Sequence, residues 1–154
     1  MRRGLSWAKI GALLVPLALA AGCRAVRGGP EAGATSSQEA VVQFLAGVKS
    51  EDLQAIAAVW GNTASPTRDR VERQELERRL LIMICHLKHD ESTLGVAQRG
   101  EEDRTIHRVV LTLGGRAVTV PFTLVQNTRS RRWFVEDVDL RPAREFCRSG
   151  SATP

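Results

Sequence analysis

The stretch HRVVLTLGGRAVTVPFTL, residues 107–124, has the pattern of a β-hairpin. On both sides of Gly114-Gly115 large apolar residues recur at every second position, which is the period of a strand with one buried face. A pair of glycines is also a signal for a two-residue turn between antiparallel strands. The residues expected on the two buried faces are His107, Val109, Leu111, Leu113, Val118, Val120, Phe122 and Leu124.

Two further strands are expected beside this hairpin. Upstream, Leu94 and Val96 alternate with smaller or polar neighbours, and downstream WFVEDVDL, residues 133–140, follows a loop at residues 127–131. Pro121 lies inside the second hairpin strand and has no N–H, so we expect it at a sheet edge or a bulge. Four strands in this order predict an antiparallel meander.

The first part of the folded chain has the apolar period of helices. Ser36 begins a capping-box pattern, S-x-x-E, before a helix over about residues 37–49. Ser50 or Asp52 is expected to cap a short second helix, and a third helix is predicted over about residues 67–88. The apolar residues at helical spacing are Val41, Phe44, Leu45 and Val48, then Leu53, Ile56, Ala57 and Trp60, then Leu76, Leu80, Met83, Ile84 and Leu87. Helices followed by strands predict an α+β domain whose sheet wraps around the helices.

Residues 1–22 have the make-up of a secretory signal peptide. Basic residues and no acidic one precede an uncharged run from Ile10 to Gly22, which is shorter than the roughly 20 apolar residues that span a bilayer. The end of this run, AAGC at residues 20–23, resembles the lipobox of bacterial lipoproteins. In a lipobox the cysteine thiol receives a diacylglyceryl group and becomes the mature N-terminus. The alternative is a plain cleavage site with an unrelated cysteine after it.

The lipobox implies a membrane-anchored protein of the bacterial cell envelope. A lipoprotein carries at least two acyl chains, with which attachment becomes effectively stable. Arg24 follows Cys23, in place of the aspartate that keeps many Gram-negative lipoproteins at the inner membrane, so we expect the outer membrane, facing the periplasm. Residues 23–36 are then the lipidated cysteine and a flexible tether, residues 37–147 the folded domain and residues 148–154 a disordered tail.

Net charge gives little support to a nucleic-acid partner. The whole chain has a formal net charge of +5. Removal of residues 1–22 takes three of the 22 basic residues and none of the 17 acidic ones, which leaves 19 against 17, a net charge of +2. The basic character of the precursor therefore belongs largely to its signal peptide, and binding to nucleic acid is not expected.

Two cysteines remain outside the anchor, Cys85 and Cys147. Beyond the cytoplasmic membrane the compartment is oxidising, so an even pair is a disulfide candidate, with two unrelated buried thiols as the alternative. A disulfide requires Cα atoms within about 7 Å of each other. It would hold the C-terminal stretch against the third helix, with Phe146 packed near Leu87.

Two stretches resemble the nuclear transport factor 2-like superfamily. They are VKSEDLQAIAAVW, residues 48–60, where two amphipathic helices meet, and RRWFVEDVDL, residues 131–140, the last strand. The resemblance covers about residues 37–141, and it is narrower to small bacterial lipoproteins and secreted proteins of this fold. It implies three N-terminal helices packed in a strongly curved four-stranded antiparallel sheet, a cone or half-barrel with an open apolar pocket. Some members are isomerases, dehydratases or cyclases, and many others only bind or assemble.

His86 and His89 stand three residues apart with Asp90 beside them, a spacing that could contribute to a zinc site. They lie where the third helix is expected to end, and polar or cationic groups are favoured there by the exposed carbonyls. The remaining histidine, His107, is on a different element. Capping of the helix end is therefore the simpler interpretation, and no metal site is predicted.

An enzyme of this fold needs an aspartate or histidine in the cone, with donors for a developing oxyanion. The catalytic candidates are His107 and Asp137. A lone histidine on an apolar strand face is usually a packing residue, and the face of Asp137 could be the cone interior or the exposed back of the sheet. The chain has no tyrosine, the usual phenol donor of the steroid-isomerase relatives.

The leading hypothesis is a lipid-anchored envelope protein that binds a partner protein or a small apolar ligand, without catalysis and without a cofactor. A homodimer is also open. The alternative is a lipid-anchored enzyme of the isomerase or dehydratase type that uses His107 or Asp137. An interior pocket separates the two, because an enzyme requires an ionisable group deep in the cone beside a hydrogen-bond donor.

Overall fold

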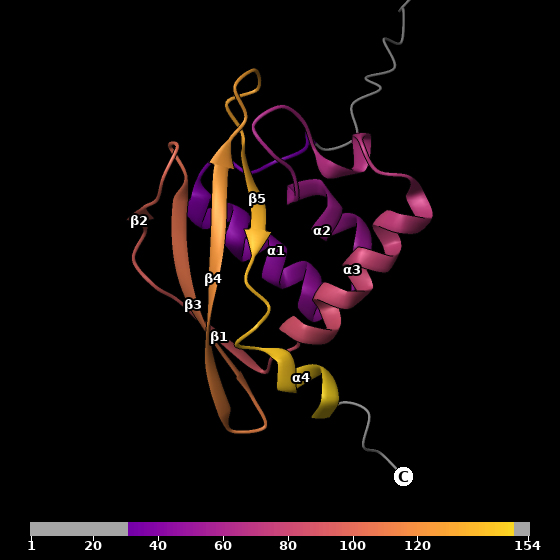
Figure 1. The fold of residues 1–154 in the computed structure, drawn as a ribbon, viewed down its shortest axis with the longest axis vertical. Helices are drawn as coiled ribbons and strands as arrows, with labels where there is room; N and C mark the ends of the chain where they lie inside the picture. Colours follow the sequence, from indigo (N-terminus) through magenta and orange to yellow (C-terminus); the bar gives the residue numbers. More distant parts are fainter. Residues whose placement is uncertain (1–30, 150–154) are drawn as a thin grey trace, which may run out of the picture.

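The computed structural model describes residues 31–149, an α+β domain with the helices gathered on one side of a single antiparallel sheet (Figure 1). The strand order is β1-β3-β4-β5, with β2 also paired to β3. The sheet does not close into a barrel, because β1 and β5 remain its two edges. The elements are α1 Ser37–Ser50, α2 Leu53–Val59, the 3-10 turn η1 Thr67–Asp69, α3 Arg73–Leu87, β1 Glu91–Leu94, β2 Gln98–Arg99, β3 Thr105–Leu113, β4 Arg116–Gln126, β5 Trp133–Val138 and α4 Arg144–Ser149.

Strands β3 and β4 are the predicted hairpin. Val109 pairs with Val120, and all of the buried β3 and β4 residues that face α1 belong to the set that alternation predicted. Gly114 and Gly115 have φ angles of +56° and +79°, the conformation that a tight hairpin turn requires and that glycine adopts without strain. A side chain at either position would meet nothing within 4 Å, so these glycines are needed for their backbone angles.

Helix α1 packs across the sheet through Phe44. The rings of Phe44 and Phe122 meet edge to face, with centroids 5.8 Å apart and planes at 81°, an arrangement that aromatic pairs favour. Both side chains are fully buried. Helix α2 packs on α1, and α3 packs on α1, α2 and α4, so the helical layer is built outward from α1.

Side-chain caps place the start of α1 where the sequence predicts it. The Oγ of Ser36 accepts a hydrogen bond from the N–H of Glu39 at 3.1 Å. The Glu39 carboxylate accepts a hydrogen bond from the N–H of Thr35 at 2.8 Å. In the usual capping box it would accept from the N–H of the N-cap residue itself, here Ser36. The Thr35 hydroxyl also donates to this carboxylate, and these bonds lower the pKa of Glu39.

The third helix is shorter than the predicted range of residues 67–88. The chain first forms η1, because the N–H of Thr67 donates to the C=O of Trp60 at 2.9 Å and ties this segment to the end of α2. Helix α3 then begins after Glu72, whose side chain accepts from the N–H groups of Gln74 and Glu75. A glutamate acts here as the N-cap, a role for which serine, threonine, aspartate and asparagine are the usual residues.

The first predicted strand is divided into β1 and β2, which both pair with β3. The prediction that Val96 shares a strand with Leu94 is wrong, since Val96 lies between the two strands and is 87% exposed. The N–H of Gly95 donates to the C=O of Arg108 at 2.8 Å. A Cβ at position 95 would lie 2.6 Å from the same oxygen, so only glycine allows the chain to approach β3 this closely.

Pro121 lies in the interior strand β4, at the point where pairing with β5 stops. Its C=O accepts from the N–H of Asp139, just beyond β5, at 3.0 Å. The N and C=O of one strand residue point to the same side. The nitrogen of Pro121, which has no hydrogen, therefore faces the chain just beyond the end of β5. A register shift between Thr123 and Leu124 lies beside it. Pro121 is therefore not in an edge strand as expected, and the bulge lies two residues further along β4.

The folded chain begins before residue 37. Ala34 and Trp133 exchange two backbone hydrogen bonds of 2.9 Å, and Ala34 is fully buried. Residues 33–36, expected to belong to the tether, are therefore part of the domain. This segment is held by backbone hydrogen bonds, which need no repeating pattern of apolar residues, so the sequence pattern did not indicate that it is folded. The predicted signal peptide, the Cys23 anchor and the tail beyond residue 149 lie outside the described residues.

Replacement of the aromatic ring in the core should be costly. Phe44→Ala should lower the free energy of unfolding by about 3 to 5 kcal/mol, through lost burial and the cavity that remains. Val42→Ala, on the same helix but with a side chain 54% exposed, is the control and should change it by less than about 0.5 kcal/mol. Urea unfolding measures both, and similar losses in the two variants would contradict the packing of α1 described above.

Candidate functional site: two grooves beside the sheet edges

His107 lies on β3, on the face toward α1, and its ring is enclosed. It is 3% exposed. Its Nε2 is 3.0 Å from the Oγ of Ser37, and its Nδ1 is 3.3 Å from the C=O of Gly95. A carbonyl pairs only with a donor, so Nδ1 carries the proton and Nε2 accepts from the Ser37 hydroxyl. Both nitrogens are used to join α1 and the segment after β1 to β3.

The ring of His107 lies among packed residues of the core. His107 does not line either of the two grooves beside the sheet edges or the polar hollow described below. The core between α1 and the sheet is filled by Phe44 and Phe122. His107 and the Ser37 hydroxyl are thus an ionisable group beside a hydrogen-bond donor, as an enzyme would need. They are, however, packed into a filled core.

His86 and His89 stand on either side of the end of α3. His89 donates from Nδ1 to the C=O of Leu87, the last residue of the helix, at 2.8 Å, which is the capping role that the sequence favoured. The Nδ1 of His86 is buried without a hydrogen-bond partner. Within residues 31–149 no cluster of three or more His, Cys, Asp or Glu side chains could hold a metal ion.

Cys85 on α3 and Cys147 on α4 form a disulfide, with Cα atoms 4.8 Å apart. Helix α4 was not predicted, and it extends to Ser149, into the stretch expected to be a disordered tail. Phe146 is 2% exposed and belongs to the same buried cluster as Leu87. A covalent bond and one buried aromatic ring together hold the end of the domain against α3.

The free edge of β5 is covered along its first half. Ala34 pairs with Trp133, and the N–H of Gly61 donates to the C=O of Val135 at 3.0 Å. Phe134 fills the space beneath both segments, because a Cβ at Gly33 or Gly61 would lie 2.7 or 2.8 Å from its ring. Two segments distant in the sequence therefore cover this edge, which would otherwise be open to pairing with another chain.

The second half of the β5 edge is open. Leu124 pairs with Val135 and Thr123 with Asp137, so Glu136 is the extra residue of a bulge. The next residue pair, Phe122 with Val138, is of the non-hydrogen-bonded type, because Asp139 bonds to β4 one residue later. The N–H and C=O of Val138 therefore point to the free edge. No strand within residues 31–149 pairs with it there.

A groove of about 220 Å³ separates this open edge from α3. We call it the β5 groove. Its apolar lining comes from Trp60, Ile82, Met83, Val138 and Leu140, and its polar lining from Arg79, Glu136 and Asp137. Ile82 is 49% exposed, and its neighbour Leu81 is 57% exposed. Helix α3 thus presents two adjacent large apolar side chains to the solvent.

Of the two acidic side chains in the β5 groove, Asp137 has no ion-pair or hydrogen-bond partner within residues 31–149. Arg79 and Glu136 each have an ion-pair partner of opposite charge. Beyond β5, hydrogen bonds from Arg141 lower the pKa of Asp139 to about 2. Asp137 is exposed, so the structure places this catalytic candidate at the rim of a surface groove and not in the interior. Its carboxylate is therefore the unpaired negative charge at this rim.

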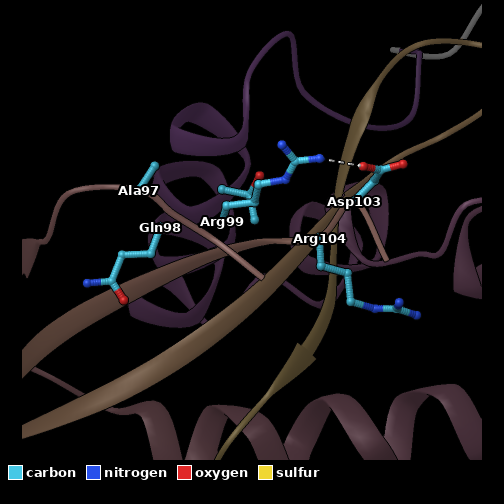
Figure 2. Close-up of a pocket in the computed structure, with 6 residues that line it drawn as sticks. Ala97, Gln98, Arg99, Asp103 and Arg104 are labelled. Atoms are coloured by element: carbon cyan, nitrogen blue, oxygen red, sulfur yellow. Dashed lines mark hydrogen bonds and ion pairs between the residues drawn. The ribbon is translucent and has the colours of Figure 1, made fainter. Parts of the chain in front are cut away.

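Another hollow, at the turn between β2 and β3, has a polar character (Figure 2). Arg99 and Asp103 form an ion pair of 3.3 Å across it, and Arg104 points away from this pair toward Glu136. The side chains of opposite charge satisfy one another, as on an ordinary solvated turn. This hollow has no unpaired group that would select a ligand.

The β5 groove was not predicted from the sequence, although one signal for it is present. Residues 80–84, LLIMI, are five successive apolar residues in a helix, whereas one buried helical face takes only three or four residues in two turns. Some of these side chains must therefore face outward. Which part of the structure these side chains face depends on where β5 lies, and the sequence of α3 carries no information about that.

No helix within residues 31–149 is both long enough and apolar enough to cross a bilayer. Comparisons with models of protein families, with curated proteins and with solved structures found no match to this chain. The fold and its surfaces define the described residues as an α+β domain with one antiparallel sheet, helices on one face and a groove beside each sheet edge.

Loss of the disulfide should destabilise the domain. Replacing both Cys85 and Cys147 by alanine frees a loop of 62 residues, which in the chain-entropy model lowers the free energy of unfolding by about 4 kcal/mol at most. Denaturant unfolding of the double variant should match that of the wild type under reducing conditions. A double variant as stable as the oxidised wild type would show that the bond contributes nothing.

Proposed function

We propose that this protein is a lipid-anchored protein of the bacterial cell envelope whose domain binds a partner protein without catalysis. The AAGC pattern at residues 20–23 and the uncharged run before it support an anchor at Cys23, and Arg24 favours the outer membrane, facing the periplasm. The disulfide between Cys85 and Cys147 supports the same assignment, since such bonds persist in oxidising compartments.

The domain is placed in the nuclear transport factor 2-like superfamily as part of this proposal. The order of three helices followed by an antiparallel meander supports the placement, as does α1 packed across the sheet. The interior, where this fold can have an open pocket, is filled by Phe44 and Phe122. A filled interior favours binding at the surface over chemistry inside the domain.

The open half of the β5 edge, beside the half-exposed Ile82, is the observation that carries the proposal. An extended peptide can add to a sheet edge as a further strand, with main-chain hydrogen bonds for affinity and side-chain pockets for specificity. Val138 offers the main-chain groups and the apolar lining offers the pocket. The unpaired carboxylate of Asp137 selects a basic side chain in the partner.

A second copy of this chain fits the edge poorly. Antiparallel pairing of two β5 edges would bring Asp137 of one copy, whose carboxylate has no partner within residues 31–149, close to Asp137 of the other. Like charges placed opposite each other on neighbouring strands are destabilising. We therefore propose that the partner is a different protein, which presents an extended segment with alternating apolar and basic residues.

The anchor has a direct test in cell fractions. Cys23→Ser should move the protein from the membrane fraction to the soluble periplasmic fraction and abolish labelling by a palmitate analogue. Ala25→Ser changes a nearby residue, keeps Cys23 and the disulfide, and should leave both the location and the label unchanged. The anchor would be refuted by a Cys23→Ser protein that stays on the membrane together with a mature wild type that carries no lipid mass.

The β5 groove can be tested with defined peptides and the full chain carrying Cys23→Ser. An acetylated pentapeptide of alternating lysine and valine should shift the NMR amide signals of residues 136–138, and its glutamate-valine counterpart should not. Ile82→Lys should weaken binding at least about tenfold, because the buried apolar contact is lost. Asp137→Asn should weaken it less, and only at low salt.

Val96→Lys is the matched control for Ile82→Lys. Val96 is an exposed apolar residue outside the β5 groove, so lysine there adds the same charge to the domain without touching the groove. It should leave the affinity unchanged. Equal losses in the two variants, or equal binding of the glutamate peptide, would exclude the proposed mode of recognition.

A further inference from the structure

A second groove, of about 270 Å³, lies between α1 and β1, at the opposite edge of the sheet from β5. We call it the β1 groove. Its apolar walls come from Val42 and Leu45 on α1 and from Leu94 on β1. Leu94 pairs with Val109, a fully buried residue of the helix-facing side, so Leu94 points toward α1. Val42 is 54% exposed and forms part of the rim.

Three polar side chains line the same groove, namely Lys49, His89 and Ser92. Ser92 pairs with Leu111, another residue of the helix-facing side, so its hydroxyl is directed to the groove. Lys49 donates from Nζ to the C=O of Asp90 at 2.8 Å, which holds the ammonium group beside His89. Two of the three ammonium protons remain for a ligand.

His89 is the unusual member of this group, because it is 7% exposed and only half satisfied. Its Nδ1 faces the C=O of Leu87 at 2.8 Å and therefore carries the proton. In the neutral ring Nε2 is then an acceptor. No described residue donates to Nε2. It is not a fully enclosed atom, since within residues 31–149 only Nδ1 of His86 is both enclosed and unpaired, and His89 lines the groove. An acceptor held in this way favours a donor from outside the chain.

The carboxylate of Asp90 is bonded away from the ammonium group. The Oδ2 of Asp90 accepts from the N–H of Gly114 at 2.8 Å, at the turn of the β3–β4 hairpin. Asp90 presents its backbone C=O to Lys49 and its side chain to the hairpin. The groove therefore combines a cation, a hydroxyl and a neutral acceptor with aliphatic walls, as small-molecule sites commonly do.

We propose that the β1 groove binds a small aliphatic carboxylic acid with a hydroxyl group close to its carboxylate. The carboxylate accepts from Lys49 and Ser92, and the ligand hydroxyl donates to Nε2 of His89. The aliphatic chain lies on Val42, Leu45 and Leu94. This site goes beyond the proposed function, since it requires neither the anchor at Cys23 nor the peptide at the β5 groove.

The test compares three acids by NMR titration of the full chain carrying Cys23→Ser. 3-Hydroxyhexanoate should bind about 3- to 10-fold more tightly than hexanoate, the effect of one neutral hydrogen bond. Hexanoate should bind at least about tenfold more tightly than acetate, because its methylene groups are buried on the aliphatic walls. The methyl signals of Leu94 and the ring signals of His89 should report the binding.

Two substitutions separate the parts of the site. His89→Asn can keep an N–H for the C=O of Leu87, but its shorter side chain places no acceptor at the position of Nε2, so it should abolish the preference for the hydroxy acid and leave hexanoate binding intact. Lys49→Met keeps the length of the side chain and should weaken both acids at least about tenfold. Lys88→Met removes a charge from an exposed residue that does not line the groove, and it should change nothing.

Three results would overturn the proposal. The first is acetate binding as tightly as hexanoate, which would mean that the aliphatic walls contribute nothing. The second is an equal loss of affinity in Lys49→Met and Lys88→Met, which would mean that only the overall charge matters. The third is the absence of any shift at Leu94 or His89 with all three acids at millimolar concentration.

Discussion

The contact between Phe44 and Phe122 is the one on which the arrangement of the helices depends. It fixes α1 across the apolar face of the sheet, and the other helices pack on α1 or on one another. A helix is about 10 Å across, and neighbouring strands are about 4.8 Å apart, so one helix covers about two strands. The sheet is wider than that. A groove remains beside each edge, one along β1 and one along β5.

The two edges are protected by different means. The β1 edge is short and interrupted at Gly95 and Val96, which limits the length available for pairing. The first half of β5 is covered by Ala34 and Gly61, and the second half carries a bulge and two acidic residues. Bulges and charges on an edge strand discourage pairing between identical chains. In the proposed function the unpaired carboxylate of Asp137 favours a strand of opposite charge.

His89 and His107 show how the same side chain differs in role with its surroundings. Both are nearly buried, and in both Nδ1 faces a backbone C=O. In His107 the second nitrogen meets Ser37, so the ring is fully used in holding the domain together. In His89 the second nitrogen has no partner within residues 31–149 and borders a groove. Both nitrogens of His107 therefore serve the fold, whereas the Nε2 acceptor of His89 is not used by it.

Local sequence determined the β3–β4 hairpin, the starts of α1 and α2 and the α+β class, because alternation, a Gly-Gly pair and the capping side chains of Ser36 and Asp52 act within a few residues. Cys85 and Cys147 were readable as a pair because, with Cys23 set aside, the chain contains no other cysteine. The AAGC pattern is equally local, and the anchor that it predicts lies outside the described residues.

Tertiary structure alone decided the rest. The pairing of Ala34 with Trp133, the break of the third helix at η1, the exposure of Val96 and the position of Asp137 at a groove rim all depend on distant partners. So do the grooves themselves, whose walls come from α1 and β1 or from α3 and β5. A periodic pattern records which face of an element is buried, but it carries no information on which other element lies beside it or where two packed layers fail to meet.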